Sequence, residues 1–269
     1  MRHAQVHPTA VVSPHAKIGA DVKIGPYSVI GDDVVLHEGV ELVSHVAIAG
    51  LTEIGKDTRI FPFASIGHQP QDLKYHGEPS RLIIGERCVI RENVTVNTGT
   101  EGGGMETRIG NDCLLMASSH VAHDCKIGNN VVIANYVGIA GHCNVGDFVR
   151  FGGICGVHQH VRIGEHAFIG AQSMVDADVI PYGMAVGNRA KLAGLNLVGL
   201  KRRGFDREAI HGLRAAYRML FSSEGNLRER VEDAATLFQN EPLVQDVLAF
   251  VTSSAERPLC LPGNGQSED

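Results

Sequence analysis

The stretch SSHVAHDCKIG, residues 118–128, places two histidines, an aspartate and a cysteine within six consecutive positions. These residue types support two kinds of chemistry. Histidine, cysteine and carboxylate side chains bind zinc. A neutral imidazole, with an ordinary pKa of about 6.5, can instead take a proton from a hydroxyl near neutral pH. The stretch therefore predicts a metal site or a histidine base, with solvated surface residues as the remaining alternative.

A six-residue repeat positions this stretch. Apolar residues recur at every sixth position over residues 6–66, again over 84–96, and then over 109–175. This period fits neither a helix, which repeats after about 3.6 residues, nor a plain strand, which repeats after about 2. It fits a short strand followed by a turn. Because one such unit cannot bury its own apolar side, we expect the units to stack into a solenoid.

A second inward-facing position lies four residues after each apolar lead and carries small or β-branched residues. Five of the six cysteines occupy it: Cys88, Cys113, Cys125, Cys143 and Cys155. We interpret them as packing residues, because a free cysteine behaves as a small apolar side chain. The sequence contains no CxxC pair, which disfavours a structural zinc site.

Two segments interrupt the repeat, and a third region follows it. Residues 67–83 (GHQPQDLKYHGEPSRLI) and 100–108 (TEGGGMETR) lose the apolar leads, and we expect them to be loops that carry binding residues. The solenoid is predicted over residues 1–187 and an α-helical C-terminal domain over 188–255. Its amphipathic segments predict three helices, at residues 206–221, 226–238 and 242–254, the first capped by Asp206. Residues 256–269 are expected to form a disordered tail.

Stacking brings histidines from distant positions together. From Ile109 the register is unbroken, so residues 18 apart lie on successive coils, about 4.8 Å apart. Five histidines then follow one edge of the solenoid over three coils: His120, His123, His142, His158 and His160. Chance scattering would not select one edge so often, so we interpret this edge as a functional site. Metal binding and base catalysis both remain open.

Composition disfavours several classes of protein. The formal charge of -6 argues against general binding to nucleic acid. No run of about 18 apolar residues occurs, so no membrane span is expected. The N-terminal MRHAQVHPTAVV lacks the apolar run of a signal peptide. We therefore expect a cytoplasmic protein.

Four strings carry a family resemblance: QDLKY (71–75), HVAHDC (120–125), GVHQH (156–160) and GLKRRGF (199–205). Together they resemble the UDP-N-acetylglucosamine 3-O-acyltransferases, and the similarity extends over nearly the whole chain. It implies an all-β solenoid, the left-handed parallel β-helix of hexapeptide repeats with three hexads per coil, followed by the small α-helical domain. It also implies transfer of a 3-hydroxyacyl chain from acyl carrier protein to the 3-hydroxyl of UDP-N-acetylglucosamine, the first step of lipid A biosynthesis. The implied enzyme is a homotrimer with its active site between neighbours, and it uses no metal or diffusible cofactor.

The resemblance also assigns roles to residues. His123 matches the general base, Asp124 the carboxylate that orients it, and the backbone N–H of Gly141 the donor to the oxyanion, so the sugar oxygen attacks the thioester directly. Ala171 is implied as the residue that limits acyl-chain length and permits a fairly long chain. Nine further residues are implied as substrate contacts: Asp72, Lys74, His120, His142, His158, Gln159, Asn196, Arg202 and Arg203. Two arginines and a lysine suit a diphosphate.

Alternatives remain at this stage. The γ-class carbonic anhydrases hold zinc with three histidines on a similar prism. The later N-acyltransferase of the same pathway acts on an amine, but it usually carries an N-terminal uridine-binding domain, and hexads that begin at residue 6 leave no room for one. The acceptor sugar can carry a 3-amino group in place of the 3-hydroxyl. Six basic residues near the first C-terminal helix suit docking of an acidic carrier protein: Lys201, Arg202, Arg203, Arg207, Arg214 and Arg218.

Overall fold

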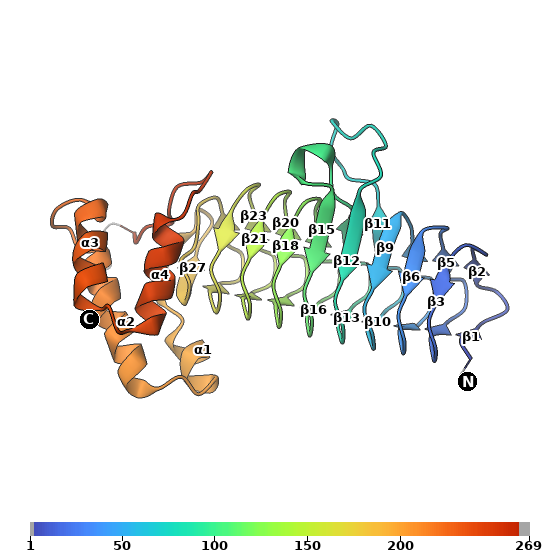
Figure 1. Cartoon of the computed structure of the whole chain (residues 1–269), viewed down its shortest axis with the longest axis horizontal. Helices are drawn as coiled ribbons and strands as arrows, with labels where there is room; N and C mark the ends of the chain where they lie inside the picture. The colour runs from blue at the N-terminus through green and yellow to red at the C-terminus, as the bar shows by residue number, and fades with distance from the viewer. Residues whose placement is uncertain (1–2, 264–269) are drawn as a thin grey trace.

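The computed structural model describes residues 3–263, and most of them form a three-sided prism of stacked coils. Figure 1 shows the prism lengthwise, with the N-terminus at one end and the helices at the other. Consecutive strands lie on successive faces, so every third strand pairs in the same sheet, and the pairing within the coils is parallel. The expected hexapeptide β-helix is confirmed. Its left hand stays a prediction from the resemblance.

The three faces are named sheets A, B and C. Sheet A contains β1 (Gln5–Val6), β4 (Lys23–Ile24), β7 (Glu41–Leu42), β10 (Arg59–Ile60), β13 (Val89–Ile90), β16 (Leu114–Leu115), β19 (Val132–Ile133), β22 (Arg150–Phe151), β25 (Phe168–Ile169), β27 (Gly183–Val186) and β28 (Lys191–Leu195). Sheet B contains β2 (Val11–Val12), β5 (Val29–Ile30), β8 (Ala47–Ile48), β11 (Ser65–His68), β14 (Thr95–Asn97), β17 (His120–Val121), β20 (Gly138–Ile139), β23 (Gly156–Val157) and β26 (Met174–Val175). Sheet C contains β3 (Lys17–Ile18), β6 (Val34–Leu36), β9 (Leu51–Ile54), β12 (Arg81–Ile84), β15 (Glu106–Ile109), β18 (Lys126–Ile127), β21 (Asn144–Val145) and β24 (Arg162–Ile163).

The apolar leads of the hexads form the core of the prism. From Ile24 onward they are almost completely buried, because each coil is covered by a neighbour on both sides. Val6, in the first coil, is about half exposed, and no coil covers it from outside. The repeat therefore buries its apolar side by stacking, as its period predicts.

Most corners of the prism bend at the fourth residue of the hexad, which there adopts a positive φ. Asp124 (59°), His142 (63°) and His160 (64°) follow this rule along the corner between sheets B and C. Asp and Asn tolerate this left-handed conformation better than most residues, whereas the β-branched Ile154 (61°) occupies it at a cost. Because the bend recurs every 18 residues, fourth-position side chains of successive coils lie above one another.

The interruptions of the repeat are shorter than the sequence predicts. β11 extends to His68 and β12 begins at Arg81, so the first loop covers residues 69–80. The second contains the short 3-10 helix η1 (Glu101–Gly103), and β15 begins at Glu106. In Figure 1 both loops rise together from the same edge of the prism.

The C-terminal region contains a strand as well as helices. β27 and β28 form an antiparallel hairpin that closes sheet A. The helices are α1 (Leu197–Arg202), α2 (Arg207–Leu220), α3 (Leu227–Leu237) and α4 (Pro242–Thr252). Asp206 caps α2 by accepting hydrogen bonds from the N–H groups of Glu208 and Ala209, as predicted. Strand β28 and helix α1 were not predicted. No helix within residues 3–263 is both long enough and apolar enough to cross a membrane.

The expectation of a disordered tail is wrong for its described part. Leu259 pairs with Asp178 in a β-bridge, Pro262 pairs with Leu192, and Cys260 is buried. The exposed prism backbone offers partners that local composition does not reveal. Residues 264–269 lie outside the described residues.

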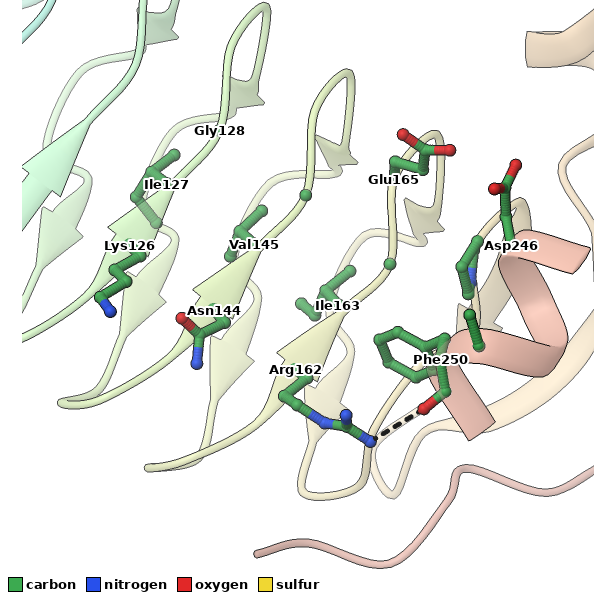
Figure 2. A pocket seen from close by; sticks show the side chains of 14 residues that line it. Lys126, Ile127, Gly128, Asn144, Val145, Arg162, Ile163, Glu165, Asp246 and Phe250 are labelled. Atoms are coloured by element: carbon green, nitrogen blue, oxygen red, sulfur yellow. Dashed lines mark hydrogen bonds between the residues drawn. The ribbon is translucent and has the colours of Figure 1, made fainter. Parts of the chain in front are cut away.

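Helix α4 covers part of sheet C and leaves a cavity of about 550 Å³ between them, shown in Figure 2. Arg162 joins the two elements: its guanidinium donates to Asp178 (2.7 Å) and stacks 4.5 Å above the ring of Phe250. This contact fixes the helical region on the prism.

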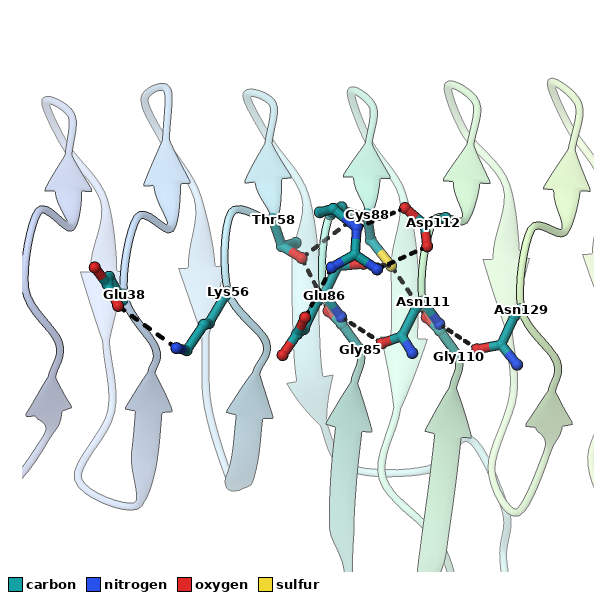
Figure 3. A network of polar contacts seen from close by, with 11 residues as sticks. Glu38, Lys56, Thr58, Gly85, Glu86, Cys88, Gly110, Asn111, Asp112 and Asn129 are labelled. Carbon is teal, nitrogen blue, oxygen red and sulfur yellow. Dashed lines mark hydrogen bonds and ion pairs between the residues drawn. The ribbon is translucent and has the colours of Figure 1, made fainter.

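Side-chain ladders reinforce the coils, and Figure 3 shows one at the corner between sheets C and A. The Asn111 side chain accepts from the N–H of Glu86 (2.8 Å), and Asn129 accepts in turn from the N–H of Asn111 (2.9 Å). The Cys88 thiol donates to the carbonyl of Gly110 on the next coil (3.1 Å). The packing interpretation of the cysteines is confirmed, because the six thiols are buried and free in the described chain.

Candidate active site

His123 and Asp124 form a buried pair at the corner that follows β17. His123 Nδ1 lies 2.8 Å from Asp124 Oδ2, and each residue is 4% exposed. The carboxylate is fixed on its other side, because Oδ1 accepts from the N–H of Thr100 (2.9 Å) and Oδ2 from the Thr100 hydroxyl. A carboxylate only accepts, so Nδ1 of His123 carries the proton and Nε2 presents a lone pair. Nε2 is the atom that can act as a base.

Asp124 is held in its charged form. Burial acts to raise the pKa of its carboxyl, but hydrogen bonds from His123 and Thr100, with the nearby His142, lower it below its ordinary value. An ionised carboxylate at Nδ1 also stabilises the imidazolium that forms when Nε2 takes a proton.

Gly141 lies directly against the His123 ring. A Cβ at this position would be 2.5 Å from His123 Cε1 and 2.6 Å from Nε2, so any larger residue would displace the imidazole. Within residues 3–263, no acceptor is recorded for the Gly141 N–H. The residue that touches the His123 ring therefore has a backbone N–H available as a donor, as an oxyanion site requires.

The predicted ladder of imidazoles is present. The ring of His142 meets His123 edge-on at 4.9 Å and stacks on His160 at 4.5 Å. Burial lowers the pKa of His142 despite the nearby Asp124 carboxylate. Burial also lowers the pKa of His120, which contacts the Thr95 hydroxyl through Nδ1 at 2.7 Å. Neutral imidazoles of this kind serve as hydrogen-bonding groups.

A groove of about 360 Å³ runs along sheet B beside His123. Its floor is a row of outward-facing residues on successive coils: His120, Gly138, Gly156 and Met174. The two glycines leave the floor open, and the Met174 side chain leans over Gly156 at the far end. Gln159 also lines the groove. Sequence reasoning missed both glycines and Met174, although their spacing of 18 residues was available as a signal.

The first loop brings Asp72 to the site. Asp72 Oδ2 lies 3.8 Å from His123 Nε2, on the side of the ring opposite Asp124. Lys74 is exposed, and its backbone N–H donates to Asp72 Oδ1 (3.0 Å). Asn97 fastens the loop by donating to the carbonyls of His68 and Gln69. The loop therefore brings a carboxylate to the Nε2 side of the His123 ring.

Three of the predicted substrate contacts lie elsewhere. Asn196, Arg202 and Arg203 line a pocket of about 740 Å³ over sheet A, together with Arg150 and Phe168. The Arg203 guanidinium lies 4.2 Å above the Phe148 ring, and burial followed by the nearby Arg150 lowers its pKa. The histidine groove therefore lies on sheet B and the arginine pocket on sheet A, and the two are separate within one chain.

Ala171 does not line either pocket. It is exposed at the corner between sheets A and B, three residues before Met174 on the same coil. His158 is exposed beside Gln159, and two tail residues contact this segment: Glu256 contacts His160 and Arg257 contacts His158. Neither tail residue was predicted.

One group of side chains is arranged closely enough to hold a metal. Among the described residues, His123, Asp124 and His142 offer ligand atoms within 4.8 Å of one another. A cation there would compete with the proton on His123 Nδ1, because the Asp124 oxygen already accepts from that atom. The base arrangement and a metal site therefore exclude each other.

Comparison with known proteins identifies the family of the chain. Models of bacterial transferase hexapeptides match residues 15–50 and 106–141, and a model described as UDP N-acetylglucosamine O-acyltransferase, domain 2, matches residues 178–260. The chain is 52% identical over 257 residues to an acyl-[acyl-carrier-protein]–UDP-N-acetylglucosamine O-acyltransferase of Caulobacter vibrioides, covering 96% of this chain and 98% of that one. The chain belongs to this O-acyltransferase family.

Two further relatives of the O-acyltransferase family agree. The Methylobacterium radiotolerans enzyme of the same name is 65% identical over 204 residues, 76% of this chain and 75% of its own. The solved structure of the Acinetobacter baumannii enzyme superposes with a TM-score of 0.92 at 39% identity, covering 94% of this chain and 99% of that chain. Membership in the O-acyltransferase family argues against the carbonic anhydrase alternative.

Proposed function

We infer that this protein transfers a 3-hydroxyacyl chain from acyl carrier protein to the 3-hydroxyl of UDP-N-acetylglucosamine, the first step of lipid A biosynthesis. Its membership in the O-acyltransferase family supports the reaction. The observation that carries the mechanism is the buried His123–Asp124 pair, which leaves the Nε2 lone pair free beside a donor N–H.

The proposed reaction is a direct acyl transfer. His123 Nε2 takes the proton of the sugar hydroxyl while the sugar oxygen attacks the thioester carbon. The negative oxygen that forms accepts a hydrogen bond from Gly141 N–H. When the C–S bond breaks, the imidazolium returns its proton to the departing thiolate of the carrier. No metal, diffusible cofactor or side-chain nucleophile takes part.

The groove on sheet B suits the acyl chain. Its glycine floor accepts an extended chain along the prism, and the chain would pass Gly156 and end near Met174. Ala171 precedes Met174 by three residues on the same coil, so we retain it as a second residue that limits chain length. His120, His142, His158 and Gln159 supply polar contacts near the reacting groups.

The arginine pocket suits the diphosphate of the acceptor, and we propose that a neighbouring subunit supplies it. Exposed apolar side chains concentrate on sheet B and on its corner with sheet A, where a second copy would cover them: Val11, Val29, Tyr27, Phe63, Tyr136 and Ile154. A homotrimer built on this face would bring the pocket of one chain toward the histidine groove of the next.

Mixing two inactive variants tests the shared site. His123→Ala and the double variant Arg202→Ala, Arg203→Ala are expected to be nearly inactive alone. Refolded together they form mixed trimers in which some interfaces carry both intact halves, so activity returns. A mixture that stays inactive while light scattering shows mixed assembly would place both halves in one chain.

The carrier protein is expected to dock on basic residues around α1 and α2, including Lys201, Arg207, Arg214 and Arg218. We propose a cytoplasmic location, because acyl carrier proteins and nucleotide sugars are made there.

The deciding experiment incubates the protein with a series of 3-hydroxyacyl carrier proteins and follows the products by mass spectrometry. UDP-N-acetylglucosamine and its 3-amino analogue are supplied as alternative acceptors. A mono-acylated nucleotide sugar that is absent with His123→Ala supports the proposal. If product forms only from the amino analogue, the acceptor is the 3-amino sugar and not UDP-N-acetylglucosamine. If no product forms from either sugar, the proposed reaction is wrong.

A further inference from the structure

The C-terminal segment, residues 256–262, is fastened to the prism beside the histidine ladder. The Asp178 N–H donates to the carbonyl of Pro258 (2.8 Å), and the Asp178 carbonyl accepts from the N–H of Cys260 (2.8 Å). Leu192 N–H donates to the Leu261 carbonyl (3.0 Å). These backbone contacts hold Glu256 and Arg257 in fixed positions against the GVHQH segment.

Arg257 makes two contacts with that segment. Its Nη2 lies 2.5 Å from His158 Nδ1, and its Nε donates to the carbonyl of Gln159 (2.8 Å). A guanidinium can only donate, so His158 Nδ1 must accept. The proton of the neutral ring is then on Nε2. The competing contact, from His158 Nδ1 to the Gln159 carbonyl, is longer (3.3 Å) and would need the proton on Nδ1. The charge-assisted contact is the stronger one.

Glu256 sets the opposite arrangement two residues further along. Its Oε2 lies 2.9 Å from His160 Nδ1, and a carboxylate only accepts, so this nitrogen carries a proton. His160 stacks on His142, which in turn lies 3.8 Å from the Asp124 carboxylate. Consecutive tail residues therefore fix the proton positions of two neighbouring histidines in opposite senses.

We propose that Arg257 is a positioning residue of the active site, which holds His158 as the Nε2–H tautomer and so presents an N–H donor to an oxygen of the bound substrate. This inference rests on the proposed role of His158 as a substrate contact. Without Arg257, the free Nδ1 can take the proton and donate to the Gln159 carbonyl, and Nε2 then becomes an acceptor that cannot serve the same oxygen.

The tautomer is measured directly by NMR of the full-length protein labelled with 15N at its histidines. Signals of His158 are identified by their loss in His158→Gln. In the wild type Nδ1 is expected to show the shift of an unprotonated nitrogen and Nε2 that of a protonated one. Arg257→Gln is expected to lose or reverse this pattern, and Arg257→Lys to restore it in part. Arg228→Gln, an exposed helix α3 residue, is the matched control and leaves the signals unchanged.

Kinetics separate positioning from direct binding. Arg257→Gln is expected to raise KM about tenfold, the usual worth of one neutral hydrogen bond, with little change in kcat. In the His158→Gln background, Arg257→Gln is expected to raise KM no further, because its effect on KM passes through the His158 imidazole. The proposal is overturned if the His158 tautomer is unchanged in Arg257→Gln. It is also overturned if Arg257→Gln raises KM as much in the His158→Gln background as in the wild type. An inactive wild type would contradict the proposed function instead, and the tautomer would still be measured.

Discussion

Replacing Asp124 by asparagine tests the central pair without removing its bulk. The Thr100 N–H can only donate, so the amide oxygen must take the place of Oδ1, which accepts that hydrogen bond at 2.9 Å. The amide nitrogen then occupies the place of Oδ2 and faces His123 Nδ1. Because an amide N–H donates, Nδ1 must accept, and the proton of the ring moves to Nε2. His123 Nε2 then has no lone pair with which to act as a base, although all residues around the pair are unchanged.

The size of the effect follows from the role of the base. General base catalysis typically contributes 10²- to 10⁴-fold, and the charge that stabilises the imidazolium is lost as well. We expect kcat to fall about 10³-fold, equivalent to about 4 kcal/mol of activation free energy. KM should change little, since the carboxylate is buried behind the imidazole and the pair lies at 4% exposure.

The assay follows transfer from 3-hydroxyacyl carrier protein to the nucleotide sugar under single-turnover conditions, with thermal unfolding of the same samples as the control for folding. Combining Asp124→Asn with His123→Ala should cost no more than His123→Ala alone, because the two residues act as one unit. A well-folded Asp124→Asn variant with less than tenfold loss would refute the tautomer argument.

Further outcomes follow from the same geometry. Gly141→Ala places a methyl group into the His123 ring and is expected to reduce kcat at least 10²-fold, as measured by the same assay, while the melting temperature changes little. Met174→Ala opens the end of the groove and should shift the preferred acyl chain to longer lengths in a competition assay. Ala171→Met should shift the preferred chain to shorter lengths in the same assay. Added Zn²⁺ should inhibit by competing for His123 and Asp124, whereas EDTA treatment should leave activity intact. The pKa of Asp124 is lower in the folded protein than the unfolded value of about 4, so the charged carboxylate stabilises the fold above pH of about 4. This stabilisation is lost as the pH falls through the folded pKa. The free energies of unfolding of wild type and Asp124→Asn, measured by denaturation, should therefore converge in acid.

The sequence was sufficient to predict the prism because its signal is local and repeated. A lead residue at every sixth position defines both the inward face and the corner, and stacking at 18-residue intervals then places His123, His142 and His160 on one edge. The same arithmetic would have placed Gly138, Gly156 and Met174 in one row. Those residues were missed because glycine and methionine in outward positions do not stand out by chemical type.

The tail was mispredicted for a different reason. Glu256 and Arg257 contact residues nearly a hundred positions earlier, and their placement depends on backbone groups of Asp178 and Leu192. No periodic pattern links these segments, and the composition of residues 256–263 favours loops. Long-range contacts made by backbone atoms carry no sequence signature.

The prism explains why a corner, and not a loop, suits the proposed base. A corner residue is fixed by coils above and below it, so the His123 imidazole is held between Gly141 on the next coil and Asp124 beside it. The first loop brings Asp72, a proposed substrate contact, to the His123 ring, and the Thr100 loop holds the Asp124 carboxylate. Because the coils are rigid and evenly spaced, the groove can only lengthen or shorten where a side chain such as Met174 blocks the row. In the proposed reaction, one substitution in this row would therefore change chain-length selection while the reacting groups keep their geometry.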